Sequence, residues 1–334
     1  MPGSSLKRAM PRIVGGVILA VLVASPLALF ADARALGAAL ERFDWWLTIP
    51  VLLLTLGNYA LRWVKWHVYL RVVGVPRLTL PDSVLTFLSA FSMSLTPGKV
   101  GEIIKAVHVQ RLTNSPVSRV AAVIAAERIT DGLAMIGLAA IGLLQFDHGR
   151  PVMGAAAVAG IAAVIILRRP ALLHATTYRL SRAPLIGPFI NAVVHHIEGF
   201  LDASNTLYAP KLVAGTVVLG MVSWFCECVA LFLILTGLGQ EPSWNLLLVS
   251  TFVLSVSSVL GALSMLPGGL GVAEASVAGL LMVLIADPDF ARADAAAATL
   301  LVRFSTLWFS VLLGVGSLIM LQRRGPYRAS TSHP

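Results

Sequence analysis

The chain has 334 residues, of which 57% are hydrophobic and only 12% charged, and its mean hydropathy is +0.85. A soluble domain needs far more polar surface than this, so the composition excludes a soluble globular protein and indicates an integral membrane protein. Several apolar runs approach or exceed the roughly 20 residues that cross a bilayer as a helix. Because these runs are unbroken, we predict an all-α polytopic fold and not a β-barrel.

The first apolar run, 13–30, follows the basic residues Lys7, Arg8 and Arg12. This pattern fits either a signal peptide or a first membrane helix, and we expect a retained helix because the run is long for a signal peptide. In chain order, the apolar pattern predicts helices near 13–30, 46–70, 82–96, 99–111, 119–144, 152–168, 211–237, 245–266, 271–286 and 294–321.

Two of the predicted apolar segments, 82–111 and 245–286, are broken in the middle. If each is a re-entrant hairpin that returns to the side it entered, about six full transmembrane helices remain. Of the 25 Lys and Arg residues, 19 then lie near the side of the N-terminus, 4 on the other side and 2 inside spans. The positive-inside rule therefore predicts a multi-pass protein of the cell inner (cytoplasmic) membrane with both termini in the cytoplasm.

We expect one transmembrane domain over 1–334, with a cytoplasmic connecting loop at about 168–211. This loop is rich in Arg and His and reads as an amphipathic helix on the anionic leaflet. The formal net charge of +9 is informative only through this placement of basic residues.

The two breaks share a Pro-Gly-x-x-Gly core. "LTPGKVGE" (95–102) is echoed by "LPGGLGVAE" (266–274), about half the chain later. The helix-breaking residues are Pro97, Gly98 and Gly101 in the first copy and Pro267, Gly268, Gly269 and Gly271 in the second. A span with an arginine in its interior follows each break. We interpret the halves 46–145 and 211–321 as inverted repeats; the alternative is chance, since Pro-Gly turns are common between helices.

Proline removes a backbone donor and glycine tolerates open dihedral angles, so each break leaves peptide groups that hydrocarbon cannot satisfy. Such backbone must be buried in protein or line a wet cavity. The helix that follows offers free N–H groups and a positive dipole end to an anion such as a lipid phosphate. Glu102 and Glu274 lie near these helix starts. They either cap the same amides or take part in substrate binding, and the sequence leaves both readings open.

Glu127, Arg128 and Asp131 interrupt an otherwise apolar span. Glu127 and Asp131 share a helix face, and Arg128 can pair with Asp131. One reading is a structural ion-pair lock between helices. The other is a polar cavity on a substrate path, which we favour because charged residues also fall on neighbouring spans. The candidate residues for binding a lipid headgroup are Arg62, Lys65, Lys99, Glu102, Glu127, Arg128, Asp131, Glu227, Glu274 and Arg303.

Trp45, Trp46, Trp63 and Trp66 are typical of an interfacial aromatic belt. The sequence holds no HExxH, Walker, CxxC or GxSxG motif, so we assign no catalytic residue and expect no metal, no cofactor and no nucleic-acid partner. Membrane lipids are the expected ligands. Oligomeric state is left open by the sequence.

Four ordered motifs, at 60–71, 95–106, 126–135 and 263–275, resemble the flippase-like proteins built on the lysylphosphatidylglycerol synthase transmembrane region. That domain is also found at the N-terminus of the multiple peptide resistance factor. The resemblance covers nearly the whole chain and implies handling or movement of polar lipids. Lysyltransferase activity is not expected, because the chain has no soluble aminoacyl-transfer domain.

The resemblance also implies a link to glycolipid, polyprenyl-phosphate or hopanoid pathways and to their lipid-biosynthesis enzymes. The sequence therefore predicts an inner-membrane lipid flippase or polar-lipid transporter that binds an anionic or zwitterionic headgroup in a midplane polar cavity. The alternative is a membrane enzyme or accessory protein acting on lipid-linked sugars, with Glu102, Glu127 or Asp131 as a general base. A third reading is a structural or assembly partner.

Overall fold

A computed structural model of the protein describes residues 32–96, 102–143, 158 and 206–323. Within these ranges every regular element is helical, which confirms the all-α prediction. The helices predicted at 13–30 and 152–168 lie outside the described residues. So do most of the connecting loop at 168–211 and the core of the first break, with Lys99, Pro97, Gly98 and Gly101.

The described elements follow the predicted order. They are α2 (Ala33–Arg42), η1 (Trp45–Leu47), α3 (Thr48–Val72), α4 (Leu80–Ser89), η2 (Ala90–Met93), α5 (Ile104–Thr113), α6 (Val117–Gly142), α10 (Pro210–Gly237), α11 (Trp244–Leu263), η5 (Pro267–Gly269), α12 (Val272–Leu284), α13 (Arg292–Arg303), the π-helix η6 (Phe304–Trp308) and α14 (Phe309–Arg323).

Two local features differ from the prediction. Helix α2 was not predicted, because its ten residues carry only a short apolar stripe; the Asp32 carboxylate caps it by accepting from the Arg34 N–H at 3.0 Å. The predicted helix 294–321 is not regular, since η6 interrupts it directly after Arg303. A π-helical turn inside an α-helix often marks a functional or strained position.

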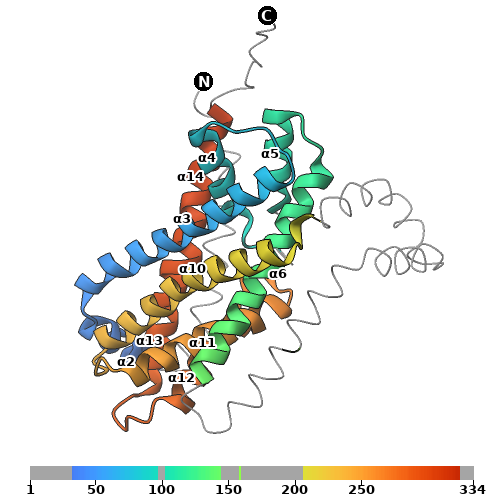
Figure 1. Ribbon diagram of the computed structural model, residues 1–334. Coiled ribbons are helices and arrows are strands. Elements are labelled where there is room, and N and C mark those ends of the chain that lie inside the picture. The colour runs from blue at the N-terminus through green and yellow to red at the C-terminus, as the bar shows by residue number, and fades with distance from the viewer. Residues whose placement is uncertain (1–31, 97–101, 144–157, 159–205, 324–334) are drawn as a thin grey trace, which may run out of the picture.

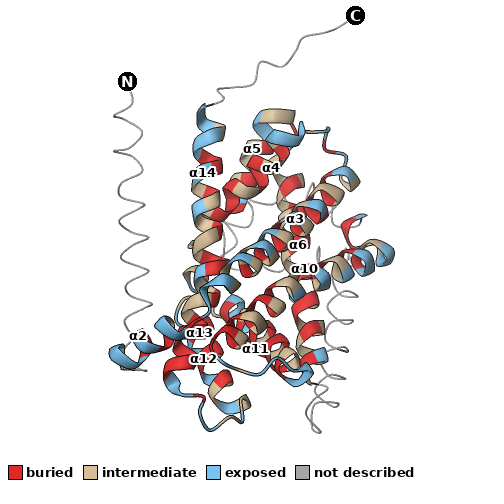
Figure 2. Cartoon of the chain, turned by 90° about the vertical axis from the view of Figure 1, so that its left-hand side faces the viewer, coloured by how far each residue is buried: buried red, intermediate tan, exposed pale blue. Residues whose placement is uncertain are grey.

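Five described segments are long and apolar enough to cross a membrane. They are Trp45–Val72, Pro210–Gly237, Trp244–Leu263, Pro267–Leu284 and Arg292–Arg323. Large apolar side chains such as Leu53, Val218 and Val283 stand exposed on their outer faces, while the inner faces are buried (Figure 2). Such surfaces suit a lipid environment, and the protein is a multi-pass membrane protein.

Helix α6 is long enough to span a bilayer, yet no 18-residue stretch of it avoids Glu127, Arg128 and Asp131. It is therefore the polar helix of the bundle. Helix α5 has only 10 residues, about 15 Å at the usual rise of an α-helix, which is too short to cross.

Figure 1 shows α4 and α5 at one end of the molecule and α2, α12 and α13 at the other. We call these the α4–α5 end and the α2–α13 end. Helix α3 finishes and α6 begins at the α4–α5 end, so the intervening segment enters and leaves there. Helix α10 finishes and α13 begins at the α2–α13 end. The helices that flank the two broken segments thus meet those segments at opposite ends of the molecule.

The two halves pack on each other reciprocally. Helix α6, late in the first half, lies along α11 of the second, and α14, late in the second half, lies along α4 and η2 of the first. Both contacts use a glycine. A β-carbon on Gly142 would lie 2.6 Å from Phe252 Cβ, and one on Gly314 would lie 2.7 Å from the carbonyl carbon of Phe91. Each half therefore packs its late helix against an early helix of the other half.

Helices α3 and α10 form the most extensive helix pair and cross at a polar contact. The Asn58 side-chain amide donates to the Ser223 carbonyl at 2.8 Å, and the Ser223 hydroxyl donates to the Asn58 carbonyl at 3.2 Å. Arg62 and Glu227 each follow this contact by one helical turn. The reciprocal hydrogen bonds fix how far α3 and α10 are shifted along each other.

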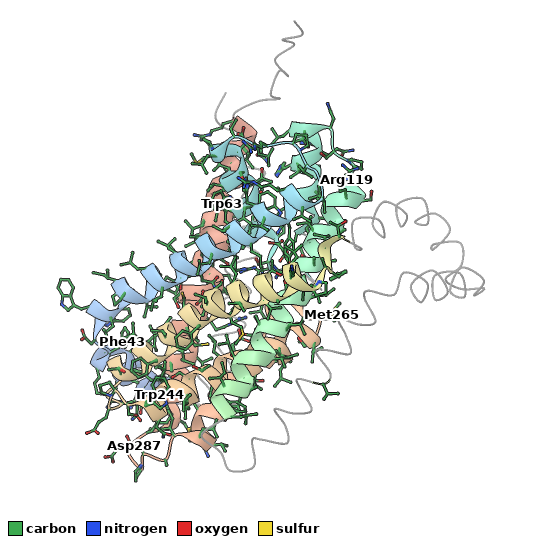
Figure 3. The ribbon with its side chains drawn as sticks, in the orientation of Figure 1. Phe43, Trp63, Arg119, Trp244, Met265 and Asp287 are labelled. Atoms are coloured by element: carbon green, nitrogen blue, oxygen red, sulfur yellow. The ribbon has the colours of Figure 1, made fainter. Side chains whose placement is uncertain are left out.

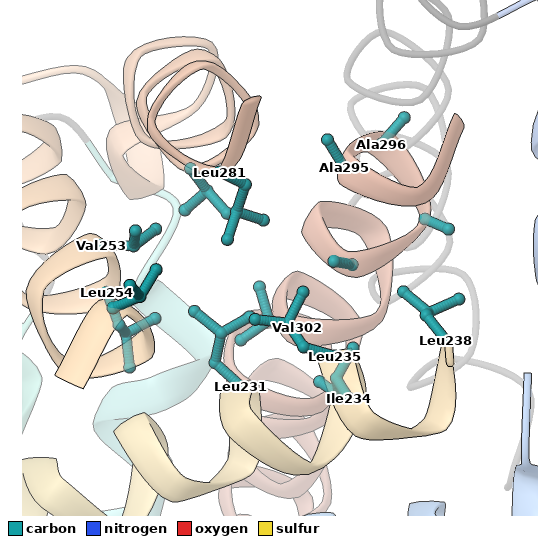
Figure 4. Close-up of a cluster of buried hydrophobic side chains, with 14 of the residues drawn as sticks. Leu231, Ile234, Leu235, Leu238, Val253, Leu254, Leu281, Ala295, Ala296 and Val302 are labelled. Atoms are coloured by element: carbon teal, nitrogen blue, oxygen red, sulfur yellow. The ribbon is translucent and has the colours of Figure 1, made fainter. Parts of the chain in front are cut away.

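Two buried apolar clusters support the ends. The one at the α2–α13 end joins α10, α11, α12 and α13 through side chains such as Leu231, Val253 and Leu281 (Figure 4). The other, toward the α4–α5 end, contains Trp66 and Tyr69. Trp66 is fully buried, so its assignment to an interfacial belt was wrong; it is a core residue. Trp45 and Trp46 are 56% and 79% exposed, as belt residues should be.

Candidate functional site

Helix α6 carries two buried carboxylates that each meet a lysine from another helix. Glu127 Oε2 lies 2.6 Å from Lys105 Nζ of α5, and Asp131 Oδ1 forms an ion pair with Lys65 of α3. All four side chains are almost completely buried. The prediction that Glu127 and Asp131 share one inward face is confirmed.

Arg128 occupies the accessible edge of this cluster. Its guanidinium lies 3.3 Å from Asp131 Oδ2, which confirms the predicted pair, and 3.5 Å from Glu102 Oε1. The Arg128 side chain is 26% exposed, more than any other charged side chain of the cluster. Its Nε is buried and meets no acceptor within the described parts of the chain. Arg128 thus has donor capacity left for a further anionic group.

Aromatic rings hold two of the cations. The Arg62 guanidinium lies 5.5 Å from the ring centre of Phe91 and 5.2 Å from that of Trp224, while a nitrogen of it is 3.9 Å from Asp131 Oδ2. Lys105 Nζ lies 5.3 Å from the Phe87 ring centre and 5.8 Å from that of Trp66. Such contacts stabilise a desolvated cation by about 2 kcal/mol and fix its position.

Hydroxyl groups continue the polar region between α3, α6 and α10. The Tyr69 hydroxyl donates to Thr216 Oγ1 at 2.9 Å and lies 3.0 Å from Thr130 Oγ1. Asn58 Oδ1 and Trp224 Nε1 are buried and have no hydrogen-bond partner among the described residues. These unpaired polar atoms need a partner, because buried polar groups are normally hydrogen-bonded.

The cluster carries an excess of positive charge. Its cations are Arg62, Lys65, Lys105 and Arg128, and its anions are Glu102, Glu127 and Asp131. Ionisable groups at membrane depth are costly unless each is compensated. One formal positive charge is left over, so the arrangement favours an added phosphate or carboxylate, for which a guanidinium is the usual bidentate donor.

The polar groups of the second break pair with one another and with Arg303. Glu274 Oε2 accepts from the Gly271 N–H at 2.7 Å and Oε1 accepts from Arg303 Nε at 2.6 Å, while an Arg303 guanidinium nitrogen donates to the Gly268 carbonyl at 2.8 Å. Of the two readings left open for Glu274, the structure shows capping. We call Glu274 and Arg303, together with the Gly268 carbonyl, the clasp of the second break.

The two halves make equivalent pairs. In each, an arginine of the late helix meets the glutamate that follows the break: Arg128 with Glu102 at 3.5 Å, and Arg303 with Glu274 at 2.6 Å. The second break also reaches the first, since a β-carbon on Gly268 would lie 3.0 Å from Leu95 Cδ2, two residues before Pro97. Gly268 of the second break therefore lies against the described residues that directly precede the first break.

Lys105 belongs to the cluster but was not predicted as a site residue. The sequence offered one signal: Lys105 follows Glu102 by three residues and so lies on the same helical face. Its partner Glu127 is 22 residues away, and only tertiary packing brings them together. Glu227, by contrast, forms no ion pair with any described residue and accepts one long hydrogen bond, from the Thr55 hydroxyl at 3.4 Å.

No metal-ligating set appears among the described residues: three or more His, Cys, Asp or Glu side chains nowhere converge there. The chemistry of the cluster, a set of guanidinium, ammonium and carboxylate groups with aromatic walls, suits headgroup recognition.

The chain is similar in sequence to several known proteins. A UPF0104 membrane protein of Methanothermobacter thermautotrophicus is 23% identical over 319 residues, covering 89% of this chain and 90% of that protein. Another from Methanocaldococcus jannaschii is 27% identical over 225 residues, covering 67% and 92%. The glycosyltransferase AglD of Haloferax volcanii is 24% identical over 342 residues, and this match covers 92% of the chain but 54% of AglD.

The family model described as the lysylphosphatidylglycerol synthase TM region matches residues 13–314. This range includes both breaks, the α6 cluster and the clasp at Arg303. The chain belongs to the lysylphosphatidylglycerol synthase transmembrane-region family.

Proposed function

We propose that this protein is a lipid flippase or polar-lipid transporter of the cell inner membrane, which binds the phosphate or another anionic part of a lipid headgroup at the α6 cluster. The observation that carries the proposal is the surplus of buried positive charge in that cluster, opened to the outside at Arg128. Zwitterionic headgroups fit as well, because three carboxylates lie beside the cations.

The difference between the two equivalent arginine–glutamate pairs supports this choice of site. Arg303 uses its guanidinium on Glu274 and on the Gly268 carbonyl, so the second break is internally satisfied. Arg128 shares two carboxylates at 3.3–3.5 Å and keeps Nε unpaired among the described residues. On this proposal Arg128 binds the headgroup, while Arg303 has a structural role at the second break. On this view 46–145 and 211–321 are inverted repeats, and their hairpins are re-entrant.

Charge at the two ends supports the orientation with cytoplasmic termini. Among the described residues, the α4–α5 end carries six basic residues and one acidic residue, namely Arg71, Arg77, Arg111, Arg119, Lys211, Arg323 and Asp82. The α2–α13 end carries three basic and seven acidic residues, namely Arg34, Arg42, Arg292, Asp32, Glu41, Asp44, Glu241, Asp287, Asp289 and Asp294. Figure 3 places Arg119 and Asp287 toward these opposite ends. The positive-inside rule puts the α4–α5 end in the cytoplasm.

The test is lipid movement in liposomes that contain the purified protein and a fluorescent phospholipid. We expect protein-dependent exchange between leaflets, reduced at least tenfold in R128Q, which keeps a polar, hydrogen-bonding side chain but removes the charge. The matched control is R119Q, on the same helix and outside the cluster, and it should behave as wild type. Equal amounts of folded protein in both variants separate a transport site from a helix lock. No exchange with any phospholipid, or equal exchange in wild type and R128Q, refutes the proposal.

A second candidate is an enzyme or accessory protein acting on lipid-linked sugars, favoured by the similarity to the glycosyltransferase AglD. Glu127 and Asp131, two of the three predicted general bases, each form an ion pair with a lysine, so neither carboxylate is free to accept a proton from a substrate in this arrangement. The test supplies the purified protein with a polyprenyl phosphate and sugar donors. Product formation that E127Q abolishes would establish this function over transport.

A further inference from the structure

Glu227 differs from every other charged residue inside the bundle. Its side chain is 2% exposed, on α10, where α10 meets α3. The other interior carboxylates, Glu102, Glu127, Asp131 and Glu274, each have a Lys or Arg partner within 4 Å, whereas Glu227 has none in the described ranges. Its described hydrogen bond comes from the neutral Thr55 hydroxyl.

A carboxylate that is buried without a cation is strongly disfavoured, and a proton is the simplest way to neutralise it. We propose that Glu227 is a proton-binding site, occupied in the conformation described here, and that it exchanges its proton during the working cycle of the α6 cluster. On release, the Glu227 O–H bond breaks, its electron pair stays on the carboxylate and the proton passes to water. On uptake these changes reverse.

Arg62 connects this site to the cluster. The positive charge of Arg62, on α3, interacts electrostatically with Glu227. The Arg62 guanidinium is also the most distant of the three cations that pair with Asp131, at 3.9 Å. The rings of Phe91 and Trp224 contact the guanidinium, and Arg62 and Glu227 lie on the facing helices α3 and α10, each one turn past the Asn58–Ser223 contact. When Glu227 is neutral, Arg62 stays with Asp131; when Glu227 is charged, it attracts Arg62. Proton exchange thus changes the positive charge available to a headgroup.

The other titratable groups near Glu227 are one tyrosine and two cysteines, which are neutral near pH 7, so Glu227 is the residue that we expect to exchange a proton. From α3, Tyr59 lies near it, and the Tyr59 hydroxyl donates to the Thr306 carbonyl at 2.7 Å. Cys226 and Cys228 flank it on α10, with the Cys228 sulfur 3.9 Å from Ser255 Oγ of α11.

The charged residues of the remaining elements packed against α10 are held elsewhere. Those of α6 outside its first turn belong to the cluster, and Asp294 and Arg303 of α13 pair with Arg42 and Glu274. Arg292 is the first residue of α13 and lies at the α2–α13 end. The first-turn residue Arg119 lies at the α4–α5 end, away from the crossing.

Infrared spectroscopy of the purified full-length protein tests protonation directly. We expect a carbonyl stretching band of a protonated carboxylic acid near neutral pH, and we expect E227Q to lose it. The control variant E241Q removes an exposed glutamate at the α2–α13 end and should keep the band. Absence of the band from wild type, or its persistence in E227Q, overturns the proposal.

The link to transport rests on the proposed function and is measured separately in liposomes with an imposed pH gradient. In wild type the gradient should shift the distribution of the fluorescent phospholipid between leaflets at least severalfold, and E227Q should exchange lipid without responding to the gradient. Exchange in wild type that ignores the gradient, or an equal response in E227Q, refutes the coupling. If no liposome shows lipid exchange, the proposed function fails, and the infrared result decides whether Glu227 binds a proton.

Discussion

At the residue scale, the polar interior is built from ion pairs whose members come from different helices. Lys105 and Glu127 show why such pairs are hard to predict. Each residue alone is a charged residue in an apolar segment, and their 2.6 Å contact exists only because α5 packs on α6. Arg128 and Asp131, by contrast, are three residues apart on one helix, so the sequence predicted their pair directly.

Removing one member of the buried Lys105–Glu127 pair should destabilise the protein. In K105M, Glu127 loses its partner while the aromatic wall is kept, and the expected loss is about 3–5 kcal/mol, typical of an uncompensated buried charge. The measurement is thermal unfolding in detergent. The double variant K105M/E127Q should recover most of the loss, because neither charge remains; a double variant as unstable as the single one would contradict this account.

At the element scale, hydropathy predicted the long helices well because their length and apolar content are local properties. The bounds of α3, α6, α10 and α11 agree with the prediction to within a few residues. Hydropathy could not predict α2, whose ten residues are stabilised by the Asp32 cap and by an ion pair between Arg42 and Asp294 at 2.9 Å. It also missed η6, since a π-helical turn depends on packing around Arg303 and not on residue type.

Close helix crossings at this scale depend on single glycines. We expect G314A to destabilise the protein by about 1–3 kcal/mol, because the new methyl group would overlap the backbone of Phe91 and Ser92. Gly316, two residues later on α14, faces open space, so G316A is the matched control and should be neutral or slightly stabilising. Chemical denaturation in detergent micelles compares the two. Equal stabilities would mean that α14 does not pack on η2 as described.

At the scale of the whole molecule, the sequence predicted the all-α polytopic architecture from its long apolar runs, and the described helices confirm it. The opposed re-entrant hairpins and the inverted repeat stay predictions. The sequence named most members of the α6 cluster, and it also proposed Glu274 and Arg303, which pair with each other at the second break. Lys99 stays a prediction, since it lies outside the described residues.

Orientation has a direct test in intact cells. In a variant without native cysteines, Q322C marks the α4–α5 end and E241C marks the α2–α13 end; both positions are exposed. A membrane-impermeant maleimide should label E241C in intact cells and Q322C only after the membrane is opened, because the positive-inside rule places Arg323 in the cytoplasm. The opposite labelling pattern would show that the chain is inserted the other way round.

The contact between Leu95 and Gly268 has a mechanical consequence. Each residue adjoins the loop of its own hairpin, and the two meet with no room for even one added methyl group between them. A larger side chain at position 268 would have to displace Leu95 and also adopt φ +62°, which L residues rarely adopt, so the second break and the segment before the first break restrict each other's position.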